Sequence, residues 1–305
     1  MLIYSDEYVD VICNDYVSDL VVVAFGPLGQ NLKGDSFWGR GLFDKLKLTG
    51  IGVRSKRSIW YQFPSWPKAA KAIRDYCQGR KVITYGTSMG GYAALKNSAS
   101  LEADVALAFS PQFSIDRAVM GGVNPTLHKY FDPELHADME IRSDDVSGRA
   151  FVIYDRYTQD DDVNAKMIEA AVPGVVRISV PFLGHEAIRA FTDSLFWHNF
   201  LSAAARGDVE EMTRLLAEAR RKAPRRSLML AERAYRRRPE KALDVFANSM
   251  TQLTKFECAW FYNRLSVYAY KAKDMRAAVN YAYLWEECVP GGEELAAWKL
   301  KLGLS

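Results

Sequence analysis

The stretch that decides the fold is residues 85–92, Tyr85-Gly86-Thr87-Ser88-Met89-Gly90-Gly91-Tyr92. It contains the pattern Gly-x-Ser-x-Gly, which places a serine in a tight turn between a strand and a helix. A β-rich apolar run leads in from Val82, and an alanine-rich run leads out to Leu95. We therefore predict a strained elbow that places Ser88 Oγ at a helix N-terminus, where free N–H groups favour negative charge. Gly86 and Gly90 are the elbow glycines, needed where a Cβ would strike neighbouring backbone.

A serine hydroxyl becomes a nucleophile only beside a positioned base; without one, the stretch is a glycine-rich turn with an incidental serine. The chain has four histidines, His128, His136, His185 and His198. His185 follows a predicted strand and lies C-terminal to the sheet, the edge at which alternating strand–helix folds deliver a base. The other three are expected to be surface or packed histidines. We therefore predict that His185 is the base for Ser88.

The acid that orients this base is expected after the strand at residues 150–154, because that loop opens on the same edge of the sheet. The loop carries four carboxylates: Asp155, Asp160, Asp161 and Asp162. Asp155 lies too close to the strand end, and Asp162 is placed to start the following helix. We predict Asp161 as the acid and Asp160 as the next choice. Asp116, which follows the strand at residues 104–109, is a further alternative.

Apolar runs and helical spacings alternate through the first two thirds of the chain. Strands are predicted at 20–25, 51–53, 81–85, 104–109, 150–154 and 176–180, and helices at 37–47, 67–76, 88–98 and 162–171. This alternation predicts an α/β fold, a mostly parallel sheet with helices on both faces. Residues 1–15 are expected to form an antiparallel edge.

The strand pattern stops near residue 195, and everything beyond it has helical composition. Breaks at 207–208, 238–240 and 273–274 are roughly 33 residues apart, a spacing that resembles tetratricopeptide repeats. We therefore predict two domains: a catalytic α/β domain over 1–200 and an all-α helical-repeat region over 201–305.

The chain order Ser88, Asp, His185 around a Gly-x-Ser-x-Gly elbow resembles the α/β-hydrolase superfamily. The resemblance covers residues 1–200, and residues 86–95 and 108–112 are also similar to bacterial members, some of them associated with surface-polysaccharide genes. It implies a serine hydrolase of the carboxylesterase type (EC 3.1.1), with an acyl-enzyme and without a cofactor. It also implies that the Met89 N–H is one oxyanion donor. The second would be Gly26 or, alternatively, Leu28, because Pro27 between them has no N–H.

The expected substrate is a small-molecule or glycan ester. Two alternatives stay open: an O-acyltransferase or deacylase acting on a sugar or polysaccharide, and a non-catalytic hydrolase-fold scaffold that binds a partner through its helices. A transferase needs the same triad as a hydrolase and differs in its acceptor site, so the sequence does not separate them.

The chain has 305 residues and a net charge of +3, but the charge is unevenly distributed. Residues 220–238 hold nine Lys or Arg and one acid, Glu232, which leaves about −5 for the remainder. Either a protein partner docks on these helices or they present a solvated basic face. Because Tyr235 is the single aromatic residue in the stretch, a nucleic-acid partner is not expected.

The four cysteines are scattered, so no metal site is expected. Neither a signal peptide nor an apolar run of about 20 residues is present, so we expect a cytoplasmic protein without a membrane segment.

Overall fold

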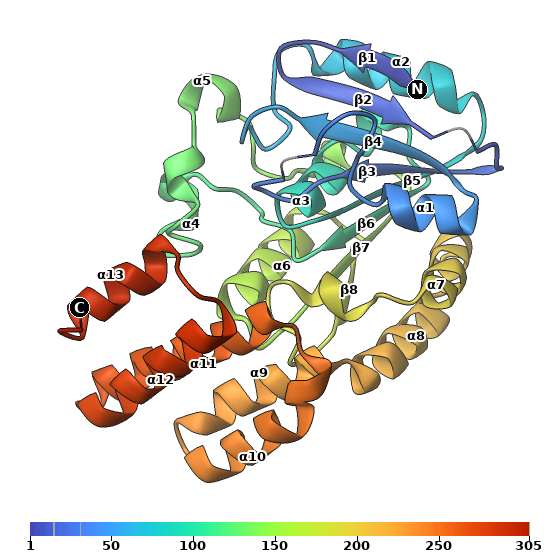
Figure 1. Cartoon of the computed structure of the whole chain (residues 1–305). Coiled ribbons are helices and arrows are strands. Elements are labelled where there is room, and N and C mark those ends of the chain that lie inside the picture. The colour runs from blue at the N-terminus through green and yellow to red at the C-terminus, as the bar shows by residue number, and fades with distance from the viewer. Residues whose placement is uncertain (15, 31, 305) are drawn as a thin grey trace. The chain divides into compact units, whose positions relative to one another are not determined.

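Figure 1 shows the computed structural model of the chain, which describes residues 1–14, 16–30 and 32–304. The chain divides into two compact units, Met1–Ala219 and Arg220–Ser305. The predicted boundary at 200/201 falls inside a helix, Ser194–Arg206 (α7). Phe200 in the middle of that helix is fully buried, so the helix belongs to the core of the first unit.

An eight-stranded sheet forms the centre of the first unit. Its strand order is β1-β2-β4-β3-β5-β6-β7-β8. The strands are β1 (Leu2–Ser5), β2 (Val9–Cys13), β3 (Leu20–Phe25), β4 (Thr49–Ser55), β5 (Lys81–Thr87), β6 (Val105–Phe109), β7 (Arg149–Tyr154) and β8 (Val176–Ser179). β3 to β8 run parallel, whereas β1 and β2 add an antiparallel edge next to β4. The predicted α/β fold class, with helices on both faces of the sheet and a helical region after it, is confirmed.

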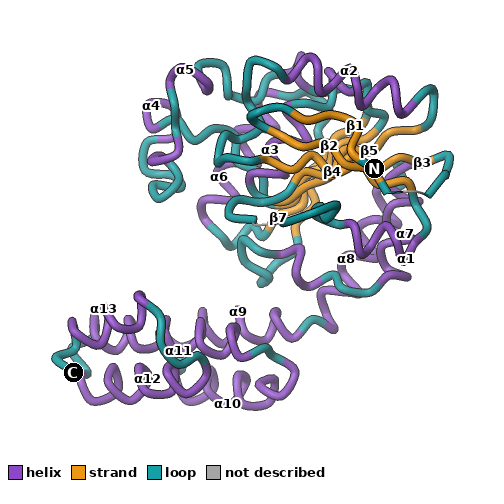
Figure 2. Tube along the Cα trace, turned by 45° about the horizontal axis from the view of Figure 1, so that its top comes forward, coloured by secondary structure: helices purple, strands orange, loops and turns teal. Residues whose placement is uncertain are grey.

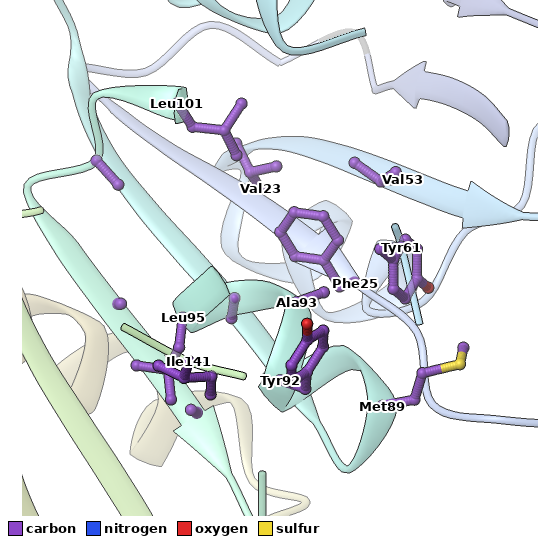
Figure 3. Packing of buried hydrophobic residues seen from close by; sticks show 14 of the residues in the cluster. Val23, Phe25, Val53, Tyr61, Met89, Tyr92, Ala93, Leu95, Leu101 and Ile141 are labelled. Atoms are coloured by element: carbon purple, nitrogen blue, oxygen red, sulfur yellow. The ribbon is translucent and has the colours of Figure 1, made fainter. Parts of the chain in front are cut away.

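Helices cover both faces of this sheet. They are α1 (Arg40–Leu46), α2 (Trp66–Cys77), α3 (Met89–Lys96), α6 (Gln159–Ala171) and α7; α8 (Val209–Lys222) follows α7 in the chain. Side chains alternate along a strand, so Val23 and Phe25 of β3 join the core that α2, α3 and α6 cover. Figure 3 shows both side chains in this core, with Phe25 close to Ala93 of α3. Burial of α3 against the strands fixes the helix that begins at the elbow.

The opposite face of the sheet packs through aromatic rings. Tyr85 of β5 contacts Phe43 of α1 at 6.4 Å and Trp197 of α7 at 5.2 Å between ring centroids. Phe109 of β6 contacts Trp197 and Phe200 of the same helix. α1 and α7 therefore lie side by side over this face (Figure 1). Large aromatic side chains contribute more buried area per residue than any others, and these hold the strand that carries the elbow.

The segment between β6 and β7 contains α4 (Arg117–Met120), α5 (Pro133–His136) and irregular turns. One buried polar anchor of this segment is His136, which is 1% exposed. Nδ1 accepts the Asp132 N–H at 2.8 Å, so Nε2 is the atom that donates to Ile59 O at 3.0 Å. Burial lowers the pKa of this imidazole below its usual 6.5.

The second unit is built of helices and loops in its described part, as Figure 2 shows by colour. The helices are α9 (Pro224–Tyr235), α10 (Pro239–Ser249), α11 (Lys255–Lys271), α12 (Met275–Cys288) and α13 (Glu293–Lys301). α9 packs on α10 and α11 on α12, and Phe246 stacks on Phe261 at 4.0 Å within their shared core. The unit is helical as predicted, while its likeness to tetratricopeptide repeats stays a prediction. Across the described residues, no helix combines the length and apolarity that a bilayer span requires.

Candidate active site

The elbow is formed where β5 meets α3. Ser88 lies between them at φ 53° and ψ −122°, a conformation that a residue with a side chain rarely adopts. A Cβ on Gly86 would lie 2.1 Å from Gly90 O, and a Cβ on Gly90 would lie 2.0 Å from Phe25 O. Both glycines are thus required by close backbone approach, and the strained turn lifts the Ser88 side chain above the end of the strand.

Ser88, His185 and Asp161 form one hydrogen-bonded chain. His185 Nε2 lies 3.0 Å from Ser88 Oγ, and its Nδ1 lies 2.7 Å from Asp161 Oδ1. A carboxylate only accepts, so Nδ1 carries the proton and Nε2 is left to accept from the Ser88 hydroxyl. The Asp161 side chain is 2% exposed and that of His185 is 37% exposed. The imidazole can therefore be reached by a substrate, whereas the carboxylate is sealed from water.

The alternative acids have other partners. Asp160 accepts the N–H of Asn124 at 3.2 Å and its side-chain amide at 3.4 Å. Asp116 caps α4 by accepting the Ala118 N–H at 2.8 Å. Of the three predicted candidates, Asp161 is thus the one that the structure places on His185.

The remaining histidines are bound to the protein or exposed. His128 contacts the carbonyl groups of Ile115 and Gly121 through its two ring nitrogens. His136 is the buried anchor described above, and His198 is exposed on α7. Over the described ranges, the His, Cys, Asp and Glu side chains form no group that could hold a metal ion.

A pocket of about 120 Å³ is lined by both Met89, which directly follows Ser88, and Gly26, which directly follows β3. Met89 is the first residue of α3, and the first N–H groups of a helix have no partner within the helix. Tyr61 Oη donates to Gly26 O at 2.9 Å and so anchors the Gly26–Pro27 peptide, next to the one that carries the Gly26 N–H. Leu28, the alternative second donor, packs against the main hydrophobic core. Met89 and Gly26 are therefore the pair that shares one cavity.

Asp155 has a structural part in the site that the sequence does not reveal. It is fully buried at the end of β7, and Oδ2 accepts the N–H groups of Leu183 and Gly184 at 2.9 and 2.8 Å. These residues immediately precede His185, so a buried carboxylate fixes the loop that carries His185. The sequence excludes Asp155 as the triad acid because it directly follows a strand. The same position brings its carboxylate to this loop.

No family model matches the sequence, and a search of curated proteins finds no match. Among solved structures, the capsule O-acetyltransferase of Neisseria meningitidis serogroup A aligns at 9% identity and a TM-score of 0.48, over 65% of this chain and 93% of that one. A 2,6-dihydroxy-pseudo-oxynicotine hydrolase aligns at 14% identity and a TM-score of 0.47, over 66% and 65%. XC6422 from Xanthomonas campestris, an a/b serine hydrolase without lid, aligns at 15% and a TM-score of 0.40, over 65% and 88%. These identities and TM-scores describe only the course of the backbone. The chemistry of the site is argued from its side chains.

Proposed function

We propose that the chain is a serine hydrolase that cleaves a carboxylic ester through an acyl-enzyme, with Ser88 as nucleophile, His185 as base and Asp161 as the orienting acid. The observation that carries the proposal is the continuous chain from Asp161 Oδ1 through both ring nitrogens of His185 to Ser88 Oγ, with steps of 2.7 and 3.0 Å. This is the arrangement in which a base accepts the serine proton while a buried carboxylate stabilises the imidazolium that forms.

Each step then follows from the positions of these groups. Ser88 Oγ bonds to the ester carbonyl carbon as its proton passes to His185 Nε2, and the N–H groups of Met89 and Gly26 receive the oxyanion. Collapse of the tetrahedral intermediate breaks the bond to the leaving alcohol, whose oxygen takes the proton from His185. Water repeats the sequence on the acyl-enzyme, releasing the carboxylic acid and regenerating the Ser88 hydroxyl.

The size of the pocket supports a short acyl group. Its volume of about 120 Å³ is well below the roughly 300–1,000 Å³ of sites that bury a drug-sized ligand. Its lining includes Met89 and Gly26, the proposed oxyanion donors, so we expect the acyl chain of a bound ester to extend into it. Acetyl esters are thus expected to react faster than octanoyl esters.

The proposal is tested by labelling the full chain with a fluorophosphonate probe, which attaches to an activated serine. Wild-type protein is expected to be labelled, and Ser88→Ala to be unlabelled with an unchanged melting temperature. His185→Ala is expected to lower the labelling rate by at least about 10³-fold, because the base is lost. Folded wild-type protein that stays unlabelled would contradict the proposal and leave the scaffold alternative.

Hydrolysis and acyl transfer are separated by one further measurement. Release of p-nitrophenol from p-nitrophenyl acetate is followed with and without a sugar acceptor, and the acetylated products are identified by mass spectrometry. A hydrolase gives acetate at the same rate in both reactions. Acetylated sugar formed in preference to acetate would favour the O-acyltransferase alternative, with the same three residues in the same roles.

A further inference from the structure

A fourth polar side chain, that of Gln112, reaches the nucleophile. Gln112 follows β6 in the segment Ser110-Pro111-Gln112 and is 1% exposed. Its Nε2 lies 3.3 Å from Ser88 Oγ, slightly longer than the usual 2.9–3.0 Å of an N–H···O bond. Its Oε1 is buried without a hydrogen-bond partner among the residues that the structure describes. Burying an amide oxygen without a hydrogen-bond partner costs folding free energy, so the presence of a glutamine at this position needs an explanation.

The backbone around Gln112 is fixed on both sides. Phe109 O accepts the Ser88 N–H at 2.9 Å, and the Ser110 N–H donates to Ile153 O at 2.8 Å. On the other side, the Phe113 N–H donates to Asn164 Oδ1 at 2.6 Å. Asn164 lies one helical turn after Asp161 on α6. The segment is therefore clamped between the elbow that carries the nucleophile and the helix that carries the acid.

The hydrogen-bonding rules of the site assign the direction of each bond. Asp161 accepts from His185 Nδ1, so His185 Nε2 accepts from Ser88, whose single proton is then used. The remaining lone pairs of Ser88 Oγ can only accept. The neighbouring atom at 3.3 Å must therefore be a donor, which is the amide nitrogen of Gln112.

We propose that Gln112 is a positioning residue for Ser88: its amide donates to Oγ and so keeps the serine proton directed at His185. This inference rests on the proposed function and adds a residue to its site. The bond also strengthens while the proton moves to His185, because partial negative charge collects on Oγ before its bond to the carbonyl carbon is complete, and hydrogen bonds to charged acceptors are stronger than neutral ones. An interaction that strengthens towards the transition state raises kcat and leaves substrate binding unchanged.

Two substitutions of similar size test the donor. Gln112→Met keeps the volume and removes the hydrogen bond, whereas Gln112→Glu keeps the shape and replaces the donor with a carboxylate. At pH 8 that carboxylate accepts the Ser88 proton in competition with His185. We expect kcat for p-nitrophenyl acetate to fall about 10-fold in Gln112→Met and about 100-fold in Gln112→Glu, with KM within twofold of wild type. Gln252→Glu, the same change at an exposed position of the second unit, is expected to match wild type.

Steady-state kinetics, fluorophosphonate labelling rates and melting temperatures are measured on the same full-length samples. The proposal is overturned if a folded variant keeps wild-type kcat. It is also overturned if both variants lose kcat equally, which would assign a packing role to Gln112, or if only KM changes, which would assign substrate binding to it. If one variant does not fold, wild-type kcat or a change confined to KM in the other still overturns the proposal. If wild-type protein or Gln252→Glu is not labelled at Ser88, the proposed function itself fails, which is a different result.

Discussion

At the scale of single residues, the choice among adjacent carboxylates is the sharpest prediction. An amide in place of Asp161 can donate to His185 Nδ1, which moves the ring proton to Nε2 and removes the acceptor for Ser88. We expect Asp161→Asn to lower kcat by about 10³–10⁴-fold, with little change in melting temperature. The kinetics of p-nitrophenyl acetate hydrolysis check this.

Asp160→Asn is the matched control for this change. Its carboxylate accepts from Asn124 and lies outside the hydrogen-bonded chain, so kcat is expected to stay within about threefold of wild type. A large loss in Asp160→Asn together with normal turnover in Asp161→Asn would show that the acid has been assigned to the wrong residue.

Ser88 and His185 can be proposed from the sequence because each stands at a recognisable junction of a strand with its following loop. For the acid, the sequence provides only an order of preference, Asp161 before Asp160, because α6 begins at Gln159 and successive residues of a helix point about 100° apart. The phase of that helix depends on packing of Ala165 and Ile168, which a local pattern does not reveal. The contact of Gln112 with Ser88 is not predicted for a similar reason. The Gly-x-Ser-x-Gly pattern describes only the junction of β5 with α3, whereas Gln112 follows the neighbouring strand β6.

At the scale of elements, the loop before His185 depends on the end of β7. Asp155 Oδ2 accepts two backbone N–H groups there, and an amide can turn only one oxygen towards them while its NH₂ faces donors. We expect Asp155→Asn to lower kcat about 10–100-fold, as the loss of a residue that supports a catalytic group does, and to lower the melting temperature. Kinetics and calorimetry measure the two effects separately.

Asp162→Asn controls for loss of a nearby carboxylate. Asp162 pairs with Lys166 at 2.6 Å on the surface of α6, and surface ion pairs contribute little, so turnover should be unchanged. If Asp155→Asn had wild-type kcat, the position of His185 would have to be set by other contacts.

Elements with a strong apolar pattern are the ones that the sequence predicts well. The run Leu20–Phe25 becomes β3 with the predicted bounds, because a strand buried on both faces is apolar throughout. The helix expected at 37–47 begins only at Arg40. Phe37, the predicted first residue, instead packs on Phe43 at 6.2 Å between ring centroids, a tertiary contact that helical spacing does not distinguish from a first turn.

At the scale of the whole molecule, His136 makes stability depend on pH. Burial lowers its pKa in the folded chain, so the unfolded chain binds the proton first as pH falls below 6.5. The free energy of unfolding therefore decreases on acidification, by at most about 1.4 kcal/mol per pH unit from this group, until the folded pKa is reached. We expect the fall in melting temperature between pH 8 and pH 5.5 to be smaller in His136→Gln than in wild type.

His198→Gln provides the control, because His198 is exposed on α7 and its loss should leave the pH dependence unchanged. Scanning calorimetry in buffers of equal ionic strength makes the comparison. An identical decrease for wild type and His136→Gln would remove His136 as the cause.

The position of the unit boundary yields the last prediction. A chain that ends at residue 200 lacks Leu201, Met212 and Leu216, which are at most 2% exposed. Removing a buried side chain of this size costs about 2–5 kcal/mol even when it is only shortened to alanine, so three such losses cancel a typical stability of 5–15 kcal/mol. A chain that ends after Lys222 keeps α7 and α8 complete. We expect residues 1–222 to fold cooperatively and to be labelled at Ser88 by a fluorophosphonate, and residues 1–200 to be insoluble or unfolded by circular dichroism. A folded, labelled 1–200 fragment would show that α8 and the end of α7 are not part of the catalytic core.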